Sequence, residues 1–346
     1  MKKKLLLIGN HTIHTYNYYH LIKDYFDEIC LITDIPRAGQ NVEPIHYVSF
    51  SYRKPLNFIR TIRKIKDVIR EFKPTVIHVH EANSVALYSF LATRSFDIPV
   101  VLTTWGSDIL VNPKKSVVLR TVARYVVKHA DVVTADAEYL AQAVVKLVPS
   151  AKQKMVIANF GIEVHDDLNI TRENIIYSNR LHKKLYNIDK IIRCFKKLDD
   201  TGRNPYRLVV AATGEDSESL KKLATDIGIA HKVEFVGWLS TEENIKMYCR
   251  SKIYVSIPDS DATSISLLEA MYYGCFPVVS DLPSKEEWIF DGKNGKRFTG
   301  DLNFVLDLTE EDFQKVAAEN KEIILQKGTI RIAREKFINM YKALNA

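Results

Sequence analysis

Short apolar runs alternate with amphipathic segments along most of the chain. Seven runs of strand length occur in the first half, at residues 4–8, 28–33, 45–49, 76–80, 100–103, 132–134 and 155–158. Short apolar runs separated by helical patterns predict strands of a parallel sheet with helices on both faces. Because ligands of such sheets bind beyond the carboxyl ends of the strands, we expect functional residues in the loops that follow them.

A second series of strand-like runs begins after the polar stretch 163–173. Its members are residues 175–178, 207–211, 233–236, 253–256 and 276–279. The pattern predicts a second doubly wound α/β domain, with residues 1–168 forming the first domain and 169–328 the second. The tail from 310 to 346 reads as two helices, and residues 329–346 could cross back to the first domain.

The composition is that of a soluble globular protein. The chain has 346 residues, 46% of them hydrophobic and 26% charged, which is enough for two domains with separate cores. The four cysteines show no CxxC spacing, so we expect reduced thiols and no zinc site. No apolar run approaches the roughly 18 to 20 residues that span a bilayer, so we expect a cytoplasmic protein.

Most of the net charge of +7 comes from the first half of the chain, above all from residues 53–73. This segment has the pattern of a basic amphipathic helix. One interpretation is a packed helix with a solvated outer face, and the other is attraction to anionic lipid at the inner face of the plasma membrane or to a phosphate-bearing acceptor. No signature of nucleic-acid recognition accompanies the charge.

The polar loop 259–264 leads into a predicted helix that has the features of an anion site. Ser264 and Ser266 are good capping residues, so free backbone N–H groups are expected near Ile265 and Ser266, where the helix dipole favours a phosphate. Glu269 lies about one turn inside the helix and its side chain leans back toward the helix start. Together with Asp261, it suits the hydroxyl groups of a nucleotide sugar.

This region resembles the large retaining family 4 of GT-B glycosyltransferases, of the type found in polysaccharide and O-antigen assembly. Asp261 and Glu269 keep the spacing of the family's Glu-x7-Glu element, and residues 266–281 follow its helix, glycine and strand. The resemblance implies two Rossmann-like domains facing each other across a cleft. It also implies that Glu269 binds the donor ribose, that the amides of Ser264, Ile265 and Ser266 hold the diphosphate, and that Asp261 meets the sugar hydroxyls.

The segment from Asn179 to Asp189 resembles the family's Arg-Leu element followed by Lys-Gly, whose cations neutralise the leaving diphosphate. Arg180 matches directly. Leu185 and Tyr186 stand where Lys-Gly would lie, so either Lys184 fills the lysine position with a one-residue shift or it is a surface lysine.

Two further segments of the second domain resemble donor-binding elements. Gly214 follows a predicted strand, where a tight turn can bring backbone close to a phosphate or simply join strand to helix. Trp238 and Leu239 resemble the segment that packs on the nucleotide base, although core burial explains Trp238 equally well.

In the first domain, Gly9 begins a loop that resembles the family's loop beneath the donor diphosphate. Trp105 and Asp108 stand in a stretch that resembles the family's His-Gly-x-Asp element, with Trp105 at the histidine position and Asp108 as the catalytic candidate. His14, His80 and Glu81 are further acceptor-side candidates. A histidine that ends a buried strand can equally be a structural hydrogen-bonding residue.

Asp259 and Asp261 also form an Asp-x-Asp pair, which in other nucleotide-sugar enzymes holds a divalent cation. We favour no metal and no cofactor, because two cations and a helix N-terminus can stabilise the departing diphosphate.

The resulting hypothesis is a glycosyltransferase of the hexosyl or N-acetylhexosaminyl class. Its partners would be a nucleotide-sugar donor and a glycan or lipid-linked acceptor, in cell-surface polysaccharide assembly. Two alternatives stay open: a sugar-nucleotide epimerase on the same fold, and a catalytically silent protein that binds nucleotide sugars.

Overall fold

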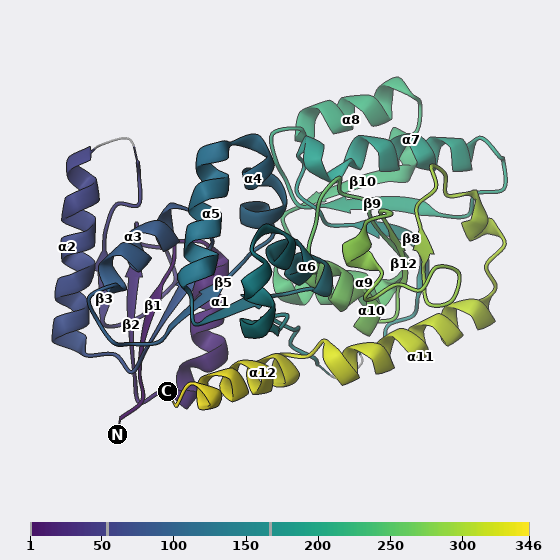
Figure 1. Ribbon diagram of the computed structural model, residues 1–346. Coiled ribbons are helices and arrows are strands. Elements are labelled where there is room, and N and C mark those ends of the chain that lie inside the picture. Colours follow the sequence, from purple (N-terminus) through teal and green to yellow (C-terminus); the bar gives the residue numbers. More distant parts are fainter. Residues whose placement is uncertain (1, 53–54, 166–167, 346) are drawn as a thin grey trace. The chain divides into compact units, whose positions relative to one another are not determined.

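A computed structural model describes residues 2–52, 55–165 and 168–345 (Figure 1). Arg53 and Lys54, at the start of the expected basic helix, lie outside the described residues. The chain forms two compact units, one made of residues 1–160 with 331–346 and the other of residues 161–330. The predicted domain boundaries were 168 and 328.

The first unit contains a seven-stranded parallel sheet in the order β3-β2-β1-β4-β5-β6-β7. Its strands are β1 (Lys4–Ile8), β2 (Glu28–Thr33), β3 (Ile45–Tyr47), β4 (Val76–His80), β5 (Val100–Thr103), β6 (Val132–Ala135) and β7 (Met155–Ile157). The predicted parallel α/β organisation is confirmed. Strand β3 is shorter than expected and half-exposed, as befits an edge strand.

Helices cover both faces of this sheet (Figure 1). They are α1 (Ile13–Ile22), α2 (Pro55–Phe72), α3 (Ser84–Thr93), α4 (Asn112–Lys115), α5 (Val117–His129), α6 (Glu138–Leu147) and α12 (Ile330–Ala343). One face packs against apolar side chains of α2, α3, α5 and α6, and the other against α1 and α12. Each face therefore has its own hydrophobic core.

Helix α12 belongs to the first unit through its aromatic side chains. Phe337 and Tyr341 are fully buried, and the Tyr341 hydroxyl lies 2.7 Å from that of Tyr18. The Tyr341 hydroxyl also contacts Nδ1 of His78, whose Nε2 lies 2.6 Å from the Thr103 hydroxyl. Burial lowers the pKa of His78 well below its usual value, so the neutral ring donates one hydrogen bond and accepts the other.

The second unit contains a six-stranded parallel sheet in the order β10-β9-β8-β11-β12-β13. Its strands are β8 (Glu173–Ser178), β9 (Arg207–Ala211), β10 (Val233–Gly237), β11 (Ser251–Ser256), β12 (Phe276–Val279) and β13 (Lys296–Arg297). Its α-helices are α7 (Ile188–Asp199), α8 (Ser217–Asp226), α9 (Thr241–Arg250), α10 (Ile265–Tyr272) and α11 (Glu310–Lys327). Sequence reasoning missed β13, whose two residues are too few for a periodic pattern.

Gly274 lets the chain pass directly from α10 into β12. Its φ of 81° is left-handed, and an added Cβ would lie 2.4 Å from the Arg172 guanidinium. Arg172 in turn donates hydrogen bonds to the carbonyl oxygens of Tyr248, Ser251 and Tyr273. The glycine and the arginine together set the position of α10.

Within the described residues, no helix is both long and apolar enough to cross a membrane.

Candidate donor and acceptor sites

Helix α10 begins as predicted at the end of the loop that follows β11. The Ser264 side chain is buried and its hydroxyl accepts the backbone N–H of Leu267 at 3.4 Å. The N–H groups of the first helical residues, Ile265 and Ser266, have no partner within the helix by its geometry. The start of α10 therefore presents a positive end of a helix dipole.

Arg180 lies at this helix start. It follows β8, and its guanidinium donates to the hydroxyls of Ser264 and Ser266 and pairs with Asp261 at 3.3 Å. The guanidinium also lies over the Tyr186 ring, 4.6 Å from its centre. The structure therefore brings Arg180 to Asp261 and the two serines, which follow it in the sequence by more than eighty residues.

A residue that sequence reasoning missed, Lys285, is the second cation on Asp261. Its side chain is only 2% exposed, and its ammonium lies 2.8 Å from Oδ2 of Asp261 and 3.1 Å from the carbonyl oxygen of Ala262. Ser284 next to it donates to the Asp261 carbonyl oxygen at 2.8 Å. Lys285 lies in the loop after a predicted strand, and that position was the available signal.

Glu269 is anchored by a network of phenols and amides. Its Oε2 accepts the Tyr248 hydroxyl at 2.9 Å, and Tyr248 accepts from the Asn179 amide at 2.7 Å. The Tyr254 hydroxyl lies within reach of both Asn179 and Ser266, at 3.1 and 2.9 Å. Burial raises the pKa of Glu269, and the hydrogen bond from Tyr248 opposes that rise.

Lys184 does not join this cluster. It begins the short 3-10 helix Lys184–Tyr186, and its side chain is exposed and forms no hydrogen bond or ion pair with any described residue. The turn itself is held by Asn187, whose amide donates to the Ile257 carbonyl oxygen and to Asp259 at 2.8 and 2.7 Å. A role of Lys184 in binding the diphosphate stays a prediction.

Gly214 is required by local packing. An added Cβ would lie 2.3 Å from the carbonyl oxygen of His182. The buried His182 ring contacts the Ser217 hydroxyl at 2.8 Å, and that hydroxyl accepts the Gly214 N–H at 2.9 Å. The close approach of two loops explains the glycine, and a contact with phosphate stays a prediction.

Trp238 is exposed. It follows Gly237, whose φ is 71°, and 71% of its surface is accessible, so the core-burial interpretation is wrong. Leu239 is partly buried against the core that contains β9 and α10. An exposed aromatic ring beside a partly buried leucine suits the predicted wall for a base.

The acceptor-side candidates of the first unit gather around Trp105. Its ring stacks on Phe160 at 4.3 Å and lies 4.6 Å from His14 and 5.5 Å from His80. Burial lowers the pKa of His80 to about 3, and neither of its ring nitrogens has a hydrogen-bond partner among the described residues. Near neutral pH His80 is therefore uncharged.

The loops beside them are tightly built. Gly9 is needed because an added Cβ would lie 2.5 Å from the Thr15 hydroxyl. Glu81 adopts a left-handed φ of 71°, which is strained for a side-chain-bearing residue, and accepts hydrogen bonds from Asn10 and Asn83. Burial raises the pKa of Glu81.

The buried side chain of Asp108 connects two of these loops. Its carboxylate is buried and accepts the backbone N–H groups of Ala82 at 2.7 Å and of Trp105 at 3.1 Å. Burial raises its pKa to about 6, although these two hydrogen bonds favour the charged form. This geometry makes Asp108 a positioning residue for both loops, and direct catalysis by it stays a prediction.

The Asp-x-Asp interpretation gains no support from the geometry. Asp261 already pairs with Arg180 and Lys285, and Asp259 accepts from Asn187 with Lys190 3.7 Å away. No group of three or more histidine, cysteine or acidic side chains suited to a metal occurs among the described residues. Both carboxylates therefore already have partners within the protein.

Both units match known glycosyltransferases in sequence. Residues 162–300 match the family Glycosyl transferases group 1, and residues 4–137 match the family Glycosyl transferase 4-like. Each unit is therefore a glycosyltransferase domain.

Two curated relatives of these glycosyltransferase domains come from Methanocaldococcus jannaschii, and both are named uncharacterized glycosyltransferases. One is 27% identical over 187 residues, covering 51% of this chain and 47% of the relative. The other is 30% identical over 135 residues, covering 39% of this chain and 33% of the relative. The matched segments thus span less than half of either relative.

Solved structures show that the two glycosyltransferase domains form a GT-B fold. HepE of Anabaena, solved with UDP and glucose, has a TM-score of 0.79 at 13% identity and covers 99% of this chain and 100% of its own. A glycosyltransferase of Rickettsia africae has a TM-score of 0.80 at 13% identity, with 99% and 98% covered. The lipopolysaccharide outer core galactosyltransferase WaaB reaches 0.73 at 14% identity, with 98% and 99% covered.

The raised pKa of Asp108 predicts a specific pH dependence of stability. Its folded-state value of about 6 exceeds the usual 3.8, so the unfolded chain releases this proton first as the pH rises. Relative to Asp108→Asn, the wild type should lose free energy of unfolding between about pH 4 and pH 6, on the order of 3 kcal/mol in total. Urea denaturation of both proteins across this range measures the difference, and parallel pH curves would contradict a raised Asp108 pKa.

Proposed function

We propose that this protein is a retaining glycosyltransferase. It moves a hexosyl or N-acetylhexosaminyl group from a nucleotide-diphosphate sugar to a hydroxyl of a glycan or lipid-linked acceptor in cell-surface polysaccharide assembly. The observation that carries the proposal is the convergence of Arg180, Ser264, Ser266 and Glu269 on the start of α10.

The start of α10 suits the donor diphosphate. The backbone N–H groups of Ile265 and Ser266 and the Arg180 guanidinium supply hydrogen-bond donors and positive charge to the same place. These groups stabilise the negative charge that develops on the diphosphate as the sugar leaves. Lys184 would add a further cation if its exposed side chain turns toward the diphosphate.

Glu269 suits the donor ribose. Tyr248 occupies one carboxylate oxygen, and the other has no partner among the described residues. A carboxylate held in one orientation by a buried network can accept hydroxyl hydrogen bonds with little loss of side-chain entropy. Trp238 and Leu239 are proposed to pack on the base, and Gly214 to approach the phosphates.

Asp261 suits the hydroxyls of the transferred sugar. Arg180 and Lys285 both bind Oδ2, which leaves Oδ1 without a partner among the described residues. Two cations around one oxygen fix the direction of the other oxygen. Because Asp is one methylene shorter than Glu, its reach would select among sugars.

The proposed mechanism is front-face displacement that retains the anomeric configuration. The departing diphosphate, held by Arg180 and the start of α10, takes the proton of the acceptor hydroxyl as the new glycosidic bond forms and the sugar–phosphate bond breaks. No protein base and no metal are required. The first unit would supply the acceptor side through Asp108, Trp105, His14, His80 and Glu81, with Gly9 near the donor diphosphate.

Uridine nucleotides are the first donors to test, because HepE of Anabaena was solved with UDP and with UDP-glucose. The alternatives separate cleanly in such assays. An epimerase would convert the donor without an acceptor, and a silent binding protein would bind it without turnover. A cytoplasmic location and peripheral membrane contact through the basic helix α2 are also part of the proposal.

We predict that Arg180→Ala and Glu269→Ala each weaken donor binding or turnover by about tenfold or more, because each removes hydrogen bonds to a charged group. Thermal stabilisation by a panel of UDP sugars measures binding, and donor consumption measures turnover. Arg203→Ala and Glu311→Ala change exposed residues of the same unit and serve as matched controls. Wild-type donor turnover in both site variants would refute the site, and an inverted product anomer in NMR would refute retention.

We predict that chelation leaves turnover unchanged. The wild type is assayed with excess EDTA and again after Mg²⁺ is restored. Since Arg180, Lys285 and α10 already supply positive charge, the two rates should agree within error. Loss of turnover in EDTA and recovery with Mg²⁺ would show that a divalent ion is needed.

We predict that Asp261→Glu changes the choice of donor sugar more than the affinity for UDP. The longer glutamate side chain moves the carboxylate oxygen that replaces Oδ1 closer to the sugar. The contacts to the diphosphate and to the ribose stay in place. Relative turnover of several UDP sugars and the Kd of UDP measure the two effects. An unchanged sugar preference would remove Asp261 from the sugar contacts.

A further inference from the structure

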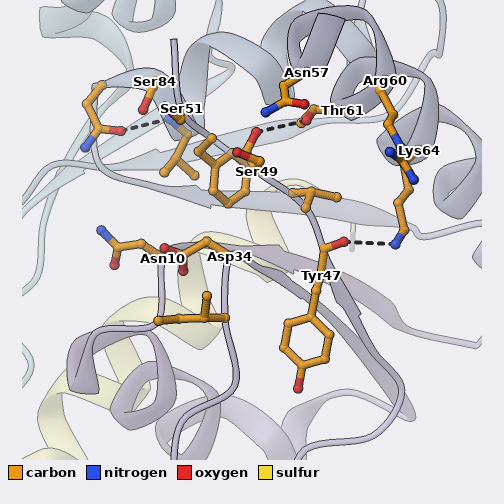
Figure 2. A pocket seen from close by; sticks show the side chains of 15 residues that line it. Asn10, Asp34, Tyr47, Ser49, Ser51, Asn57, Arg60, Thr61, Lys64 and Ser84 are labelled. Atoms are coloured by element: carbon orange, nitrogen blue, oxygen red, sulfur yellow. Dashed lines mark hydrogen bonds between the residues drawn. The ribbon is translucent and has the colours of Figure 1, made fainter. Parts of the chain in front are cut away.

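The first unit contains a cavity of about 690 Å³ that is lined by both polar and apolar side chains and is separate from the residues grouped around Trp105 (Figure 2). It lies among the segments that follow β1, β2 and β3, one face of α2, and the start of α3. Its lining includes Asn10, Asp34, Ser49, Asn57, Arg60 and Lys64.

The position and size of the cavity suit a small ligand. The segments after β1, β2 and β3 lie at the carboxyl ends of parallel strands, the edge at which open α/β sheets bind their ligands. The volume falls within the range of roughly 300 to 1,000 Å³ that is typical of small-molecule sites.

Two cations line one edge of the cavity. Arg60 and Lys64 lie one turn apart on α2 and border the cavity side by side (Figure 2). The Lys64 ammonium donates to the Tyr47 carbonyl oxygen at 2.9 Å, which holds it at the rim. The Arg60 guanidinium forms no hydrogen bond or ion pair with any residue that the structure describes. Like charges at this spacing repel each other, and a bound anion would relieve that repulsion.

Asp34 is the acidic residue of the lining, and its carboxylate is already hydrogen-bonded within the protein. Its carboxylate accepts the backbone N–H of His11 at 2.8 Å and lies 3.0 Å from the His11 ring nitrogen. The Thr33 hydroxyl donates to the same carboxylate at 3.3 Å. With Arg60 and Lys64 against Asp34, the net charge of the lining is positive.

The rest of the lining supplies groups that suit hydroxyls. Asn57 and the Ser49 hydroxyl have no hydrogen-bond partner among the described residues. The Asn10 amide donates to Glu81 at 2.8 Å, and its oxygen accepts the Thr12 N–H at 3.3 Å and keeps a second lone pair for a hydroxyl. The Thr61 hydroxyl donates to the Ser49 carbonyl oxygen at 2.9 Å and fixes the cavity wall to α2. Amides and hydroxyls beside two cations suit a sugar that carries a phosphate.

We propose that this cavity binds a phosphate-bearing sugar group of the acceptor. The phosphate lies against Arg60 and Lys64, and the sugar hydroxyls meet Asn57, Ser49 and Asn10. The identification of the ligand as the acceptor rests on the proposed glycosyltransferase function, whereas the preference for a sugar phosphate rests on the cavity alone.

The test compares two double variants with the same loss of charge on the same helix. Arg60→Gln/Lys64→Gln removes both cations of the cavity, and Arg63→Gln/Lys66→Gln removes two basic residues of α2 that do not line it. Asn57→Asp adds a carboxylate to the cavity without shortening a side chain. Full-length proteins with matching melting temperatures are titrated with glucose 1-phosphate and with glucose, in excess UDP to occupy a donor site.

We expect the wild type and Arg63→Gln/Lys66→Gln to bind glucose 1-phosphate with similar Kd. The Arg60→Gln/Lys64→Gln and Asn57→Asp proteins should bind it at least about tenfold more weakly, because hydrogen bonds to a charged group are lost or opposed. Glucose should bind more weakly than glucose 1-phosphate to the wild type. Absence of wild-type binding, equal weakening in both double variants, or equal binding of glucose would each overturn the proposal.

A second measurement separates a free sugar phosphate from a lipid headgroup and from general surface attraction. Co-sedimentation with phosphatidylglycerol vesicles should fall to a similar extent in both double variants, since it depends on the total charge of α2. A vesicle effect confined to Arg60→Gln/Lys64→Gln, without an effect on glucose 1-phosphate, would overturn the sugar-phosphate site. If only the cavity proposal fails, the variants of α2 still bind UDP. If the proposed function fails, the Arg180 and Glu269 variants keep wild-type donor turnover.

Discussion

Parallel pairing of strands is the constraint on which both glycosyltransferase domains depend. It places the carboxyl ends of neighbouring strands at one edge of each sheet, so loops distant in sequence become neighbours. In the second unit this edge brings Asp261, after β11, to Arg180, after β8, and to Lys285, after β12. In the first unit it brings Asn10, after β1, to Glu81, after β4.

The two units hold a carboxylate of the candidate sites in different ways, Asp261 partly buried and Asp108 buried. Asp261 is paired with two cations on one oxygen, which fixes the direction of the other. Among the described residues, Asp108 has only backbone N–H groups as hydrogen-bond partners, and burial raises its pKa to about 6. The first arrangement suits a ligand that needs a fixed hydrogen-bond acceptor, and the second suits a residue that positions two loops of the proposed acceptor side.

The strands and the helix start at Ser264 could be predicted because each depends on local sequence: apolar runs for the strands, and a capping residue before an apolar helix for α10. Lys285 could not be identified, because its pairing with Asp261 depends on how the loop after β12 folds back on the loop after β11. The exposure of Trp238 could not be predicted either. The left-handed backbone of the preceding Gly237 turns the ring to solvent, and the φ of a glycine cannot be read from the sequence. The cavity beside α2 combines five separate segments, so the periodicity of the sequence could not predict it.

Helix α12 adds a constraint on the order of folding. Its Phe337 and Tyr341 complete the core beneath α1, yet residues 331–346 follow the whole second unit in the chain. During synthesis, residues 161–330 leave the ribosome before Tyr18 and His78 of the first unit can pack against Tyr341. The unit that begins first in the chain is therefore completed last. Its aromatic core stays incomplete on one side until α12 has been translated.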